Sequence, residues 1–121
     1  MLDLEGDCAS VEWIQEFSDQ YYARSGRYVV LYSSPSWWEE CTDNSDAFTD
    51  TNPLDMACWD DEPCDPQGSW PFYTFWQYVV FHAIDLTMIL TYDRNADTND
   101  YGGDSDVFNG DLTQLKKLAT G

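Results

Sequence analysis

Buried-type strands alternate with amphipathic helical segments along this chain, and this alternation restricts the fold more than any other feature. Residues 28–32 form a continuous run of aromatic and aliphatic side chains, which is typical of a strand buried on both faces. Upstream of it, apolar residues at three- and four-residue spacing predict a helix that stops at Ser25-Gly26: Val11, Ile14, Phe17 and Tyr21. Strands that alternate with helices in this way favour an α/β fold with a parallel sheet.

The same patterns predict further elements. The remaining strands are expected at residues 1–5, 54–59 and 72–78. A short helix is expected to open at Ser34-Pro35 and to pass through Trp37, Trp38 and Glu40. A final helix is capped by Asp111, and one face of it carries Leu112, Leu115 and Leu118.

The chain is strongly acidic, with 23 Asp and Glu residues against five Lys and Arg and a formal net charge of −18. Such a surface repels phosphate backbones and anionic lipids, so we expect no nucleic-acid partner and no membrane partner. The longest apolar run, residues 78–90, contains His82 and Asp85 and is shorter than the roughly 20 residues that span a bilayer. No signal peptide is visible at the start of the sequence.

Four cysteines indicate disulfides rather than a zinc site: Cys8, Cys41, Cys58 and Cys64. They form no CxxC pair, and the chain has a single histidine to add to them. Two disulfides in a secreted protein fit better, and four cysteines allow three pairings. The turn-rich stretch between Cys58 and Cys64 favours a bond between these two, which leaves Cys8 with Cys41.

Two carboxylates, Asp3 and Glu5, lie two residues apart on the first predicted strand. Alternation along a strand places both on one face, roughly 6.5–7 Å apart, while Leu2 and Leu4 point into apolar packing. Glycosidic cleavage needs an acid that protonates the leaving oxygen and a carboxylate that stabilises the developing cation. By themselves, however, two such residues in so acidic a chain are more often solvated acids than catalysts.

Four blocks, in the same order, resemble glycoside hydrolase family 25, the N,O-diacetylmuramidases. The first is MLDLEG at residues 1–6, similar to the family's catalytic D-x-E strand. The second is GRYVVLYSS at 26–34, with the aromatic pair Trp37-Trp38 after it. The third and most specific is WPFYTFWQY at 70–78, and the fourth is GDSDVFNG at 103–110, similar to the closing V-D-x-N-x-F-x-G.

The resemblance implies a partial (β/α) TIM-like barrel, made of roughly its C-terminal five strands and without the N-terminal strands. Residues 1–121 would then be a single incomplete catalytic domain. A closed barrel of this type takes at least about 200 residues. We therefore expect the 121 residues by themselves to be poorly folded and nearly inactive.

The resemblance also implies a peptidoglycan-cleaving muramidase (lysozyme), which hydrolyses the β-1,4 bond between N-acetylmuramic acid and N-acetylglucosamine. Glu5 would be the proton donor and Asp3 its partner. Tyr32 and Trp76 would be cleft walls, and Asp104 an acid near the barrel mouth. The protein would be an extracellular monomer with bacterial peptidoglycan as its partner and with no metal or organic cofactor.

Three alternatives stay open at this point. The first is a non-catalytic secreted glycan-binding protein with an aromatic cleft. The second is a small, acidic, disulfide-bonded secreted protein with no sugar site. For Tyr32 and Trp76 individually, the alternative is packing in the core.

One residue and two segments bear on how closely the chain follows the family pattern. Asp55 stands where the family usually has an aromatic residue. Residues 79–95 have no counterpart in the pattern, and we hypothesise that they are a retained intron. The acidic loop 97–106 has the character of a calcium loop, but Tyr101 holds a ligand position and Phe108 stands where a bidentate Glu is needed, so we expect no metal there.

Overall fold

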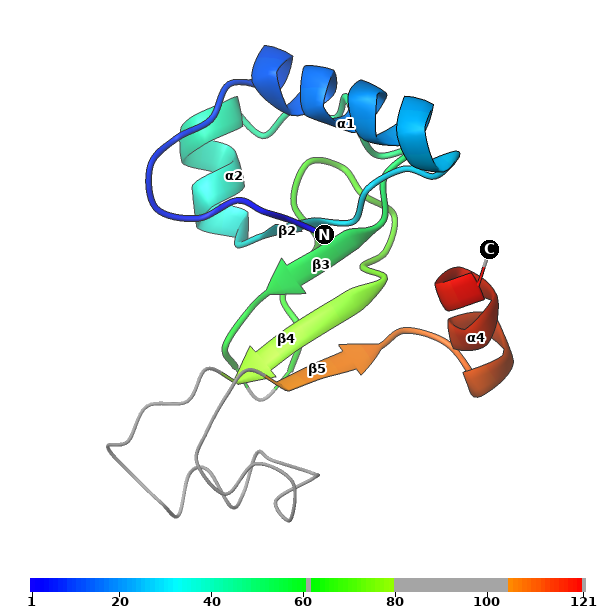
Figure 1. Cartoon of the computed structure of the whole chain (residues 1–121). Helices are drawn as coiled ribbons and strands as arrows, with labels where there is room; N and C mark the ends of the chain where they lie inside the picture. The colour runs from blue at the N-terminus through cyan, green and yellow to red at the C-terminus, as the bar shows by residue number, and fades with distance from the viewer. Residues whose placement is uncertain (61, 80–104, 121) are drawn as a thin grey trace.

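Five strands form one sheet in the order β1-β2-β3-β4-β5 (Figure 1). The computed structural model describes residues 1–60, 62–79 and 105–120. In chain order the elements are β1 (Leu2–Asp3), α1 (Val11–Ser25), β2 (Leu31–Ser33), α2 (Pro35–Thr42), β3 (Leu54–Ala57), β4 (Phe75–Val79), β5 (Ser105–Phe108) and α4 (Leu112–Thr120). Among the described residues, no helix is long and apolar enough to cross a bilayer. The segment 80–104 lies outside this description; it holds His82, Asp104, most of the acidic loop 97–106 and most of residues 79–95.

The predicted α/β fold with roughly five strands is confirmed, and the four strands that the sequence patterns predict pair in parallel, whereas the last strand was not predicted by them. β1, β2, β3 and β4 pair in parallel, whereas β5 runs antiparallel to β4, and the arrows in Figure 1 show this reversal. The register places Phe75 opposite Phe108, and their rings lie 5.3 Å apart. Sequence patterns predict no strand at β5, because two adjacent apolar residues, Val107 and Phe108, are too few to indicate a strand.

Helix α1 ends where the sequence predicts, and both of its ends are capped. The Ser10 hydroxyl accepts a hydrogen bond from the Trp13 amide at 3.1 Å, and Gly26 ends the helix in the left-handed conformation with φ +75°. Its buried face is narrower than expected, because the fully buried positions are Ile14 and Ser18. Phe17, which the apolar spacing placed on the buried face, is 37% exposed because it lies to one side of Ile14 and Ser18 on the helix.

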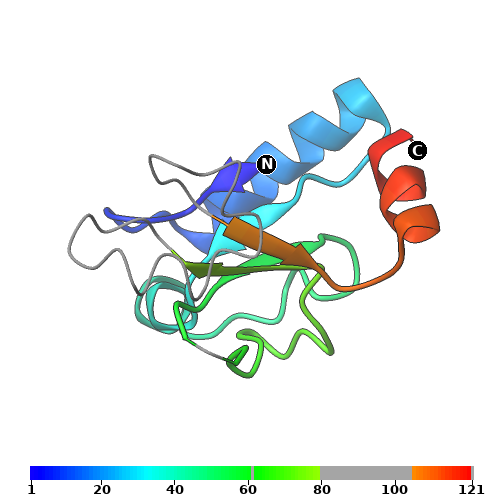
Figure 2. The ribbon, with the colours of Figure 1, turned by 90° about the horizontal axis from the view of Figure 1, so that it is seen from below.

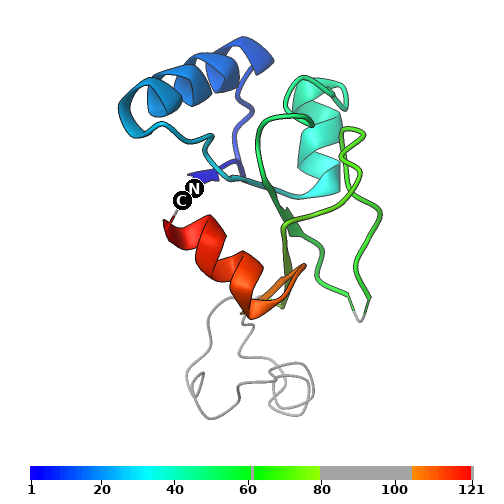
Figure 3. The same ribbon diagram turned by 90° about the vertical axis from the view of Figure 1, so that its right-hand side faces the viewer.

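The core lies between the sheet and the helices α1 and α2, which cover the same face of it (Figures 1 and 3). Leu2 and Leu4 of the first strand segment point into this core, as predicted. Trp38 of α2 is fully buried, and its ring meets Phe48 and Trp70 edge-on, at centroid distances of 5.8 and 5.1 Å. The face of the sheet that carries the aliphatic strand residues therefore packs into the hydrophobic core. The opposite face is left for polar side chains.

Strand β2 is shifted toward the carboxyl end compared with the predicted run 28–32. Tyr28 is 39% exposed, and its ring packs on Tyr22 at 4.5 Å instead of joining the sheet. Pairing starts only at Leu31, which lies beside Leu2 on one side and Leu54 on the other. The Tyr28 ring thus packs against α1. From the sequence alone, an aromatic residue with this role looks the same as the first residue of a strand.

Helix α4 stands apart from α2 (Figures 1 and 2). Asp111 caps it as predicted, because its carboxylate accepts a hydrogen bond from the Gln114 amide at 2.8 Å. The predicted apolar face meets no core: Leu115 and Leu118 are half-buried, and Leu112 is 65% exposed. Arg27 connects α4 to the segment before β2 by donating to the carbonyl oxygen of Leu118 at 3.1 Å.

Gly68 lies under α2 in a space that has no room for a side chain. Its φ is +56°, and a Cβ atom there would lie 2.5 Å from the Ser45 carbonyl oxygen and 2.6 Å from Trp38 Nε1. Gly26 has a similar φ of +75°, but nothing lies within 4 Å of the same position. Substitution of either glycine would therefore strain the backbone, but only a side chain at Gly68 would also clash with neighbouring atoms.

We expect Gly68→Ala to lower the free energy of unfolding by roughly 2–4 kcal/mol, because strain and overpacking add. The matched control Gly26→Ala should cost only about 1–2 kcal/mol, from strain alone. Urea unfolding followed by tryptophan fluorescence measures both values. Equal losses in the two variants would contradict the packing described around Trp38.

Candidate active site

A cavity of about 320 Å³ opens at the edge of the sheet where β1, β2 and β3 end. Carboxyl ends of parallel strands meet at one edge, so the loops that follow them come together there. The residues that line the cavity come from the ends of β2 and β3, from the segments that follow the strands and from α2: Glu5, Gly6, Tyr32, Ser34, Ser36, Trp37, Glu40, Ala57 and Trp59. The cavity therefore combines carboxylates with aromatic rings.

Glu5 reaches this cavity because Leu2 and Leu4 hold the strand segment in register. Leu2 donates its amide to the Val30 carbonyl at 2.8 Å, and Leu4 donates to the Tyr32 carbonyl at 2.9 Å. With both leucines in the core, alternation turns Asp3 and Glu5 to the opposite face, where both are exposed. Glu5 lines the cavity. Asp3 lies two residues earlier on the same face and is in register with Tyr32.

Tyr32 is a buried member of the cavity wall, 7% exposed. Its hydroxyl donates to Gln77 Oε1 at 2.6 Å, and the same oxygen accepts a hydrogen bond from Trp59 Nε1 at 2.9 Å. Gln77 is itself 3% exposed. One buried amide of β4 therefore links an aromatic ring of β2 to another that follows β3.

Trp76 lies on the other face of the sheet from Glu5 and Tyr32. It is in register with Met56 of the core, is 7% exposed, and donates its indole N–H to the Cys58 carbonyl at 2.7 Å. This location agrees with the core-packing alternative that the sequence left open. The structure thus brings Glu5 and Tyr32 together, places Asp3 beside them, and does not bring Trp76 to the cavity; Asp104 lies outside the described residues.

Both disulfides lie in segments that lead into or away from the cavity, and the favoured pairing is confirmed. Cys8 follows the Glu5 segment and bonds to Cys41 of α2. Cys58 directly follows β3 and bonds to Cys64. The Gly6 carbonyl also accepts a hydrogen bond from Trp37 Nε1 at 3.1 Å. The loops after β1 and β3 are therefore held covalently, which limits how far the cavity rim can move.

Sequence reasoning missed two residues of this region. Trp59 lines the cavity, but the sequence placed it as the last residue of the predicted strand 54–59, whereas the observed strand ends at Ala57. The one signal was an aromatic residue at the carboxyl end of a predicted strand. Asp55 was considered only as a missing aromatic wall. It is a buried carboxylate, 5% exposed, in register with Tyr32 and Phe75.

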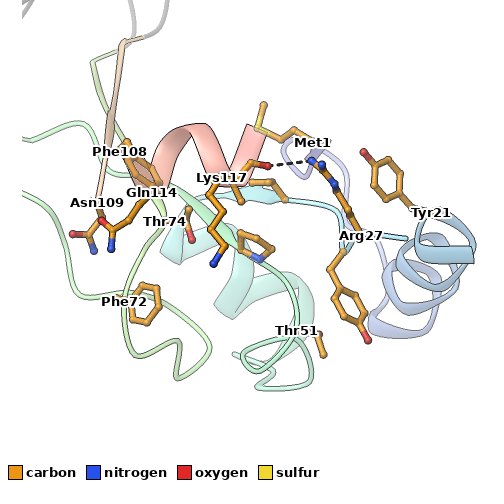
Figure 4. Close-up of a pocket in the computed structure, with 14 residues that line it drawn as sticks. Met1, Tyr21, Arg27, Thr51, Phe72, Thr74, Phe108, Asn109, Gln114 and Lys117 are labelled. Carbon is orange, nitrogen blue, oxygen red and sulfur yellow. Dashed lines mark hydrogen bonds between the residues drawn. The ribbon is translucent and has the colours of Figure 1, made fainter. Parts of the chain in front are cut away.

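A second and larger cavity, of about 630 Å³, lies at the opposite edge of the sheet (Figure 4). Its lining is largely apolar and includes two cations, Arg27 and Lys117, but no carboxylate. In Figure 4 the Arg27 guanidinium makes the hydrogen bond that ties down α4. This cavity lacks the carboxyl groups that glycosidic cleavage uses, so the smaller cavity with Glu5 is the candidate active site. The described residues also contain no group of three or more His, Cys, Asp or Glu able to hold a metal ion.

The sequence matches one known family over most of its length. The profile of the family described as Glycosyl hydrolases family 25 matches residues 1–84. An N,O-diacetylmuramidase from Arthroderma benhamiae is 41% identical over 132 residues, which cover 100% of this chain and 49% of that protein. An N,O-diacetylmuramidase from a Chalaropsis species is 41% identical over 133 residues, with 100% and 55% covered. The chain thus spans about half the length of these curated relatives.

Solved structures give the same result for the fold. A muramidase from Trichobolus zukalii superposes with a TM-score of 0.78 at 37% identity, covering 98% of this chain and 54% of that one. A family GH25 lysozyme from Aspergillus fumigatus superposes with a TM-score of 0.78 at 32% identity, covering 99% and 55%. The chain therefore corresponds to about half of each of these structures.

The shared amide oxygen of Gln77 generates a prediction about stability. We expect Gln77→Leu to lower the free energy of unfolding by about 1–3 kcal/mol, because it leaves the buried Tyr32 hydroxyl without this acceptor. Tyr32→Phe removes the donor of the same hydrogen bond, so the double variant should cost less than the sum of the single ones, by about 0.5 kcal/mol or more. Urea unfolding of the four proteins measures this coupling; additive losses would show that the hydrogen bond contributes nothing.

Proposed function

The chain belongs to glycosyl hydrolases family 25, and from this membership we propose that it acts on bacterial peptidoglycan as a muramidase. In this proposal it hydrolyses the β-1,4 bond between N-acetylmuramic acid and N-acetylglucosamine, and residues 1–121 form a single, incomplete catalytic domain. The observation that carries the proposal is the position of Glu5, in a cavity at the carboxyl edge of the sheet with Tyr32 and Trp59 in its wall. The curated relatives that bear the name N,O-diacetylmuramidase support the choice of substrate.

Glu5 is proposed as the proton donor. Its side chain is exposed and lies at a cavity rim, where a glycan strand can reach it from solvent. Protonation of the glycosidic oxygen by Glu5 lets the bond break, and the sugar ring then carries positive charge. Asp3 is proposed as the partner carboxylate: it stabilises this charge or orients the 2-acetamido group, from the same face of the strand.

The other proposed contacts have different support. Tyr32 is proposed as a cleft wall, since its ring lines the cavity and its hydroxyl is fixed by Gln77. Asp104 and Trp76 are proposed as substrate contacts on the family resemblance alone. For Trp76, its place in the hydrophobic core favours the packing role instead.

We also propose an extracellular location. The two disulfides support it, because such bonds form and persist in oxidising environments and are rare in the cytosol.

A second candidate function is glycan binding without cleavage. Trp59 favours it, because its ring lines the cavity and is 58% exposed. This alternative predicts that binding to bacterial walls survives when Asp3 and Glu5 are both replaced by their amides. The muramidase proposal predicts that wall cleavage is lost in the same protein.

We expect Glu5→Gln to reduce the release of reducing sugars from purified bacterial walls by at least about 100-fold, since general acid catalysis contributes on that scale. The amide keeps the size of the side chain, so sedimentation with the walls should not change. We expect release by the unaltered 121-residue chain to be slow, so the assay needs long incubations.

Glu12→Gln is the matched control for this experiment, because Glu12 is also an exposed acid but lies in the first turn of α1. Equal release by Glu5→Gln and Glu12→Gln would remove Glu5 from the acid role. Wall binding with no release by the unaltered chain would favour the glycan-binding alternative.

A further inference from the structure

We propose that Trp59 is a substrate-binding residue, whose indole face stacks on a sugar ring of the glycan held beside Glu5. The proposal rests on the proposed function, because it assigns a role in the same cavity. It also assigns a positioning role to the loop closed by Cys58–Cys64 and to Gln77, which together hold the indole in place.

Among the aromatic rings that line the cavity, Trp59 is the one that is largely exposed to solvent. Tyr32 is 7% exposed, Trp37 is 8% exposed and Trp59 is 58% exposed. A pyranose ring presents a face of C–H groups, which packs on an open aromatic face and cannot pack on a ring already covered by protein. Stacking at this site therefore requires Trp59 rather than the two buried rings.

The indole of Trp59 is oriented before any ligand binds. Its N–H donates to Gln77 Oε1 at 2.9 Å, and Gln77 is 3% exposed and also accepts from the Tyr32 hydroxyl. Because the polar edge of the indole points to this buried amide, its apolar faces remain for a ligand. A ring that is already fixed loses less conformational freedom on binding than a mobile one.

The backbone next to Trp59 is also held. Cys58 donates its amide to the Gln77 carbonyl at 3.0 Å, and its own carbonyl accepts from Trp76 Nε1 at 2.7 Å. The disulfide from Cys58 to Cys64 then closes the loop that carries Trp59. Trp76 thus contributes to the cavity indirectly, by fixing the residue before Trp59.

Trp13 of α1 offers a matched comparison. It is 49% exposed, but it does not line the cavity and its ring stacks on Phe17 at 5.8 Å. Exposure of an indole alone would make the two residues equivalent. The proposal makes them different, because Trp59 alone lies beside Glu5.

The test is a titration of the 121-residue chain with a soluble tetramer of N-acetylglucosamine, which carries the 2-acetamido pyranose rings of the proposed substrate. With ¹⁵N-labelled tryptophan, the indole N–H signals report each ring separately by NMR, and Trp59→Phe identifies the signal of Trp59. We expect the Trp59 signal to shift on saturation and the Trp13 signal to stay in place. Trp59→Ala should weaken binding at least about fivefold, while Trp13→Ala should leave Kd unchanged.

The outcomes separate this inference from the proposed function. A Trp59 signal that does not move in the saturated protein would overturn the stacking role while glycan binding stands, and this readout needs no folded alanine variant. An unchanged Kd in a folded Trp59→Ala protein would overturn it in the same way. An unaltered chain that is folded, as dispersed indole N–H signals show, and that binds no tetramer would overturn the stacking role and the proposed glycan substrate together.

Discussion

The pairing of β1 with β2 is the interaction on which the rest of the site depends. β1 is only two residues long, and its alignment comes from the amides of Leu2 and Leu4, which donate to the β2 segment, and from the burial of both leucine side chains. A slip by one residue would send the carboxylates into the core and the leucines into solvent. The direction of the Asp3 and Glu5 side chains is therefore fixed by their apolar neighbours, and Trp37 of α2 donates a hydrogen bond to the Gly6 carbonyl just after them.

Sequence patterns predicted those parts of the fold that depend on local chemistry. The boundaries of α1 follow from Ser10 and Gly26, whose capping geometry is encoded by residue type. The pairing of Cys58 with Cys64 follows from the turn-rich stretch between them. The direction of Leu2 and Leu4 follows from strand periodicity, which also places Asp3 and Glu5 together on the opposite face.

What the patterns could not predict depends on contacts between distant segments. β5 owes its pairing to β4, and its own four residues contain too little apolar character to indicate a strand. The W-Q-Y block suggested Trp76 as a cleft wall, yet alternation sends Gln77 to the cavity side and Trp76 to the core. Trp59 was missed because its role comes from Gln77, which is 18 positions away in sequence.

The two edges of the sheet differ in how they are held. Both disulfides join segments at the edge with the candidate site, whereas at the other edge α4 buries no residue fully and is tied to the body through Arg27. Local opening needs little free energy where few contacts must break, and more where the chain is cross-linked. The protein should therefore loosen from α4 inward on mild heating or protease treatment, so that the rim around Glu5 is the last part to lose its shape.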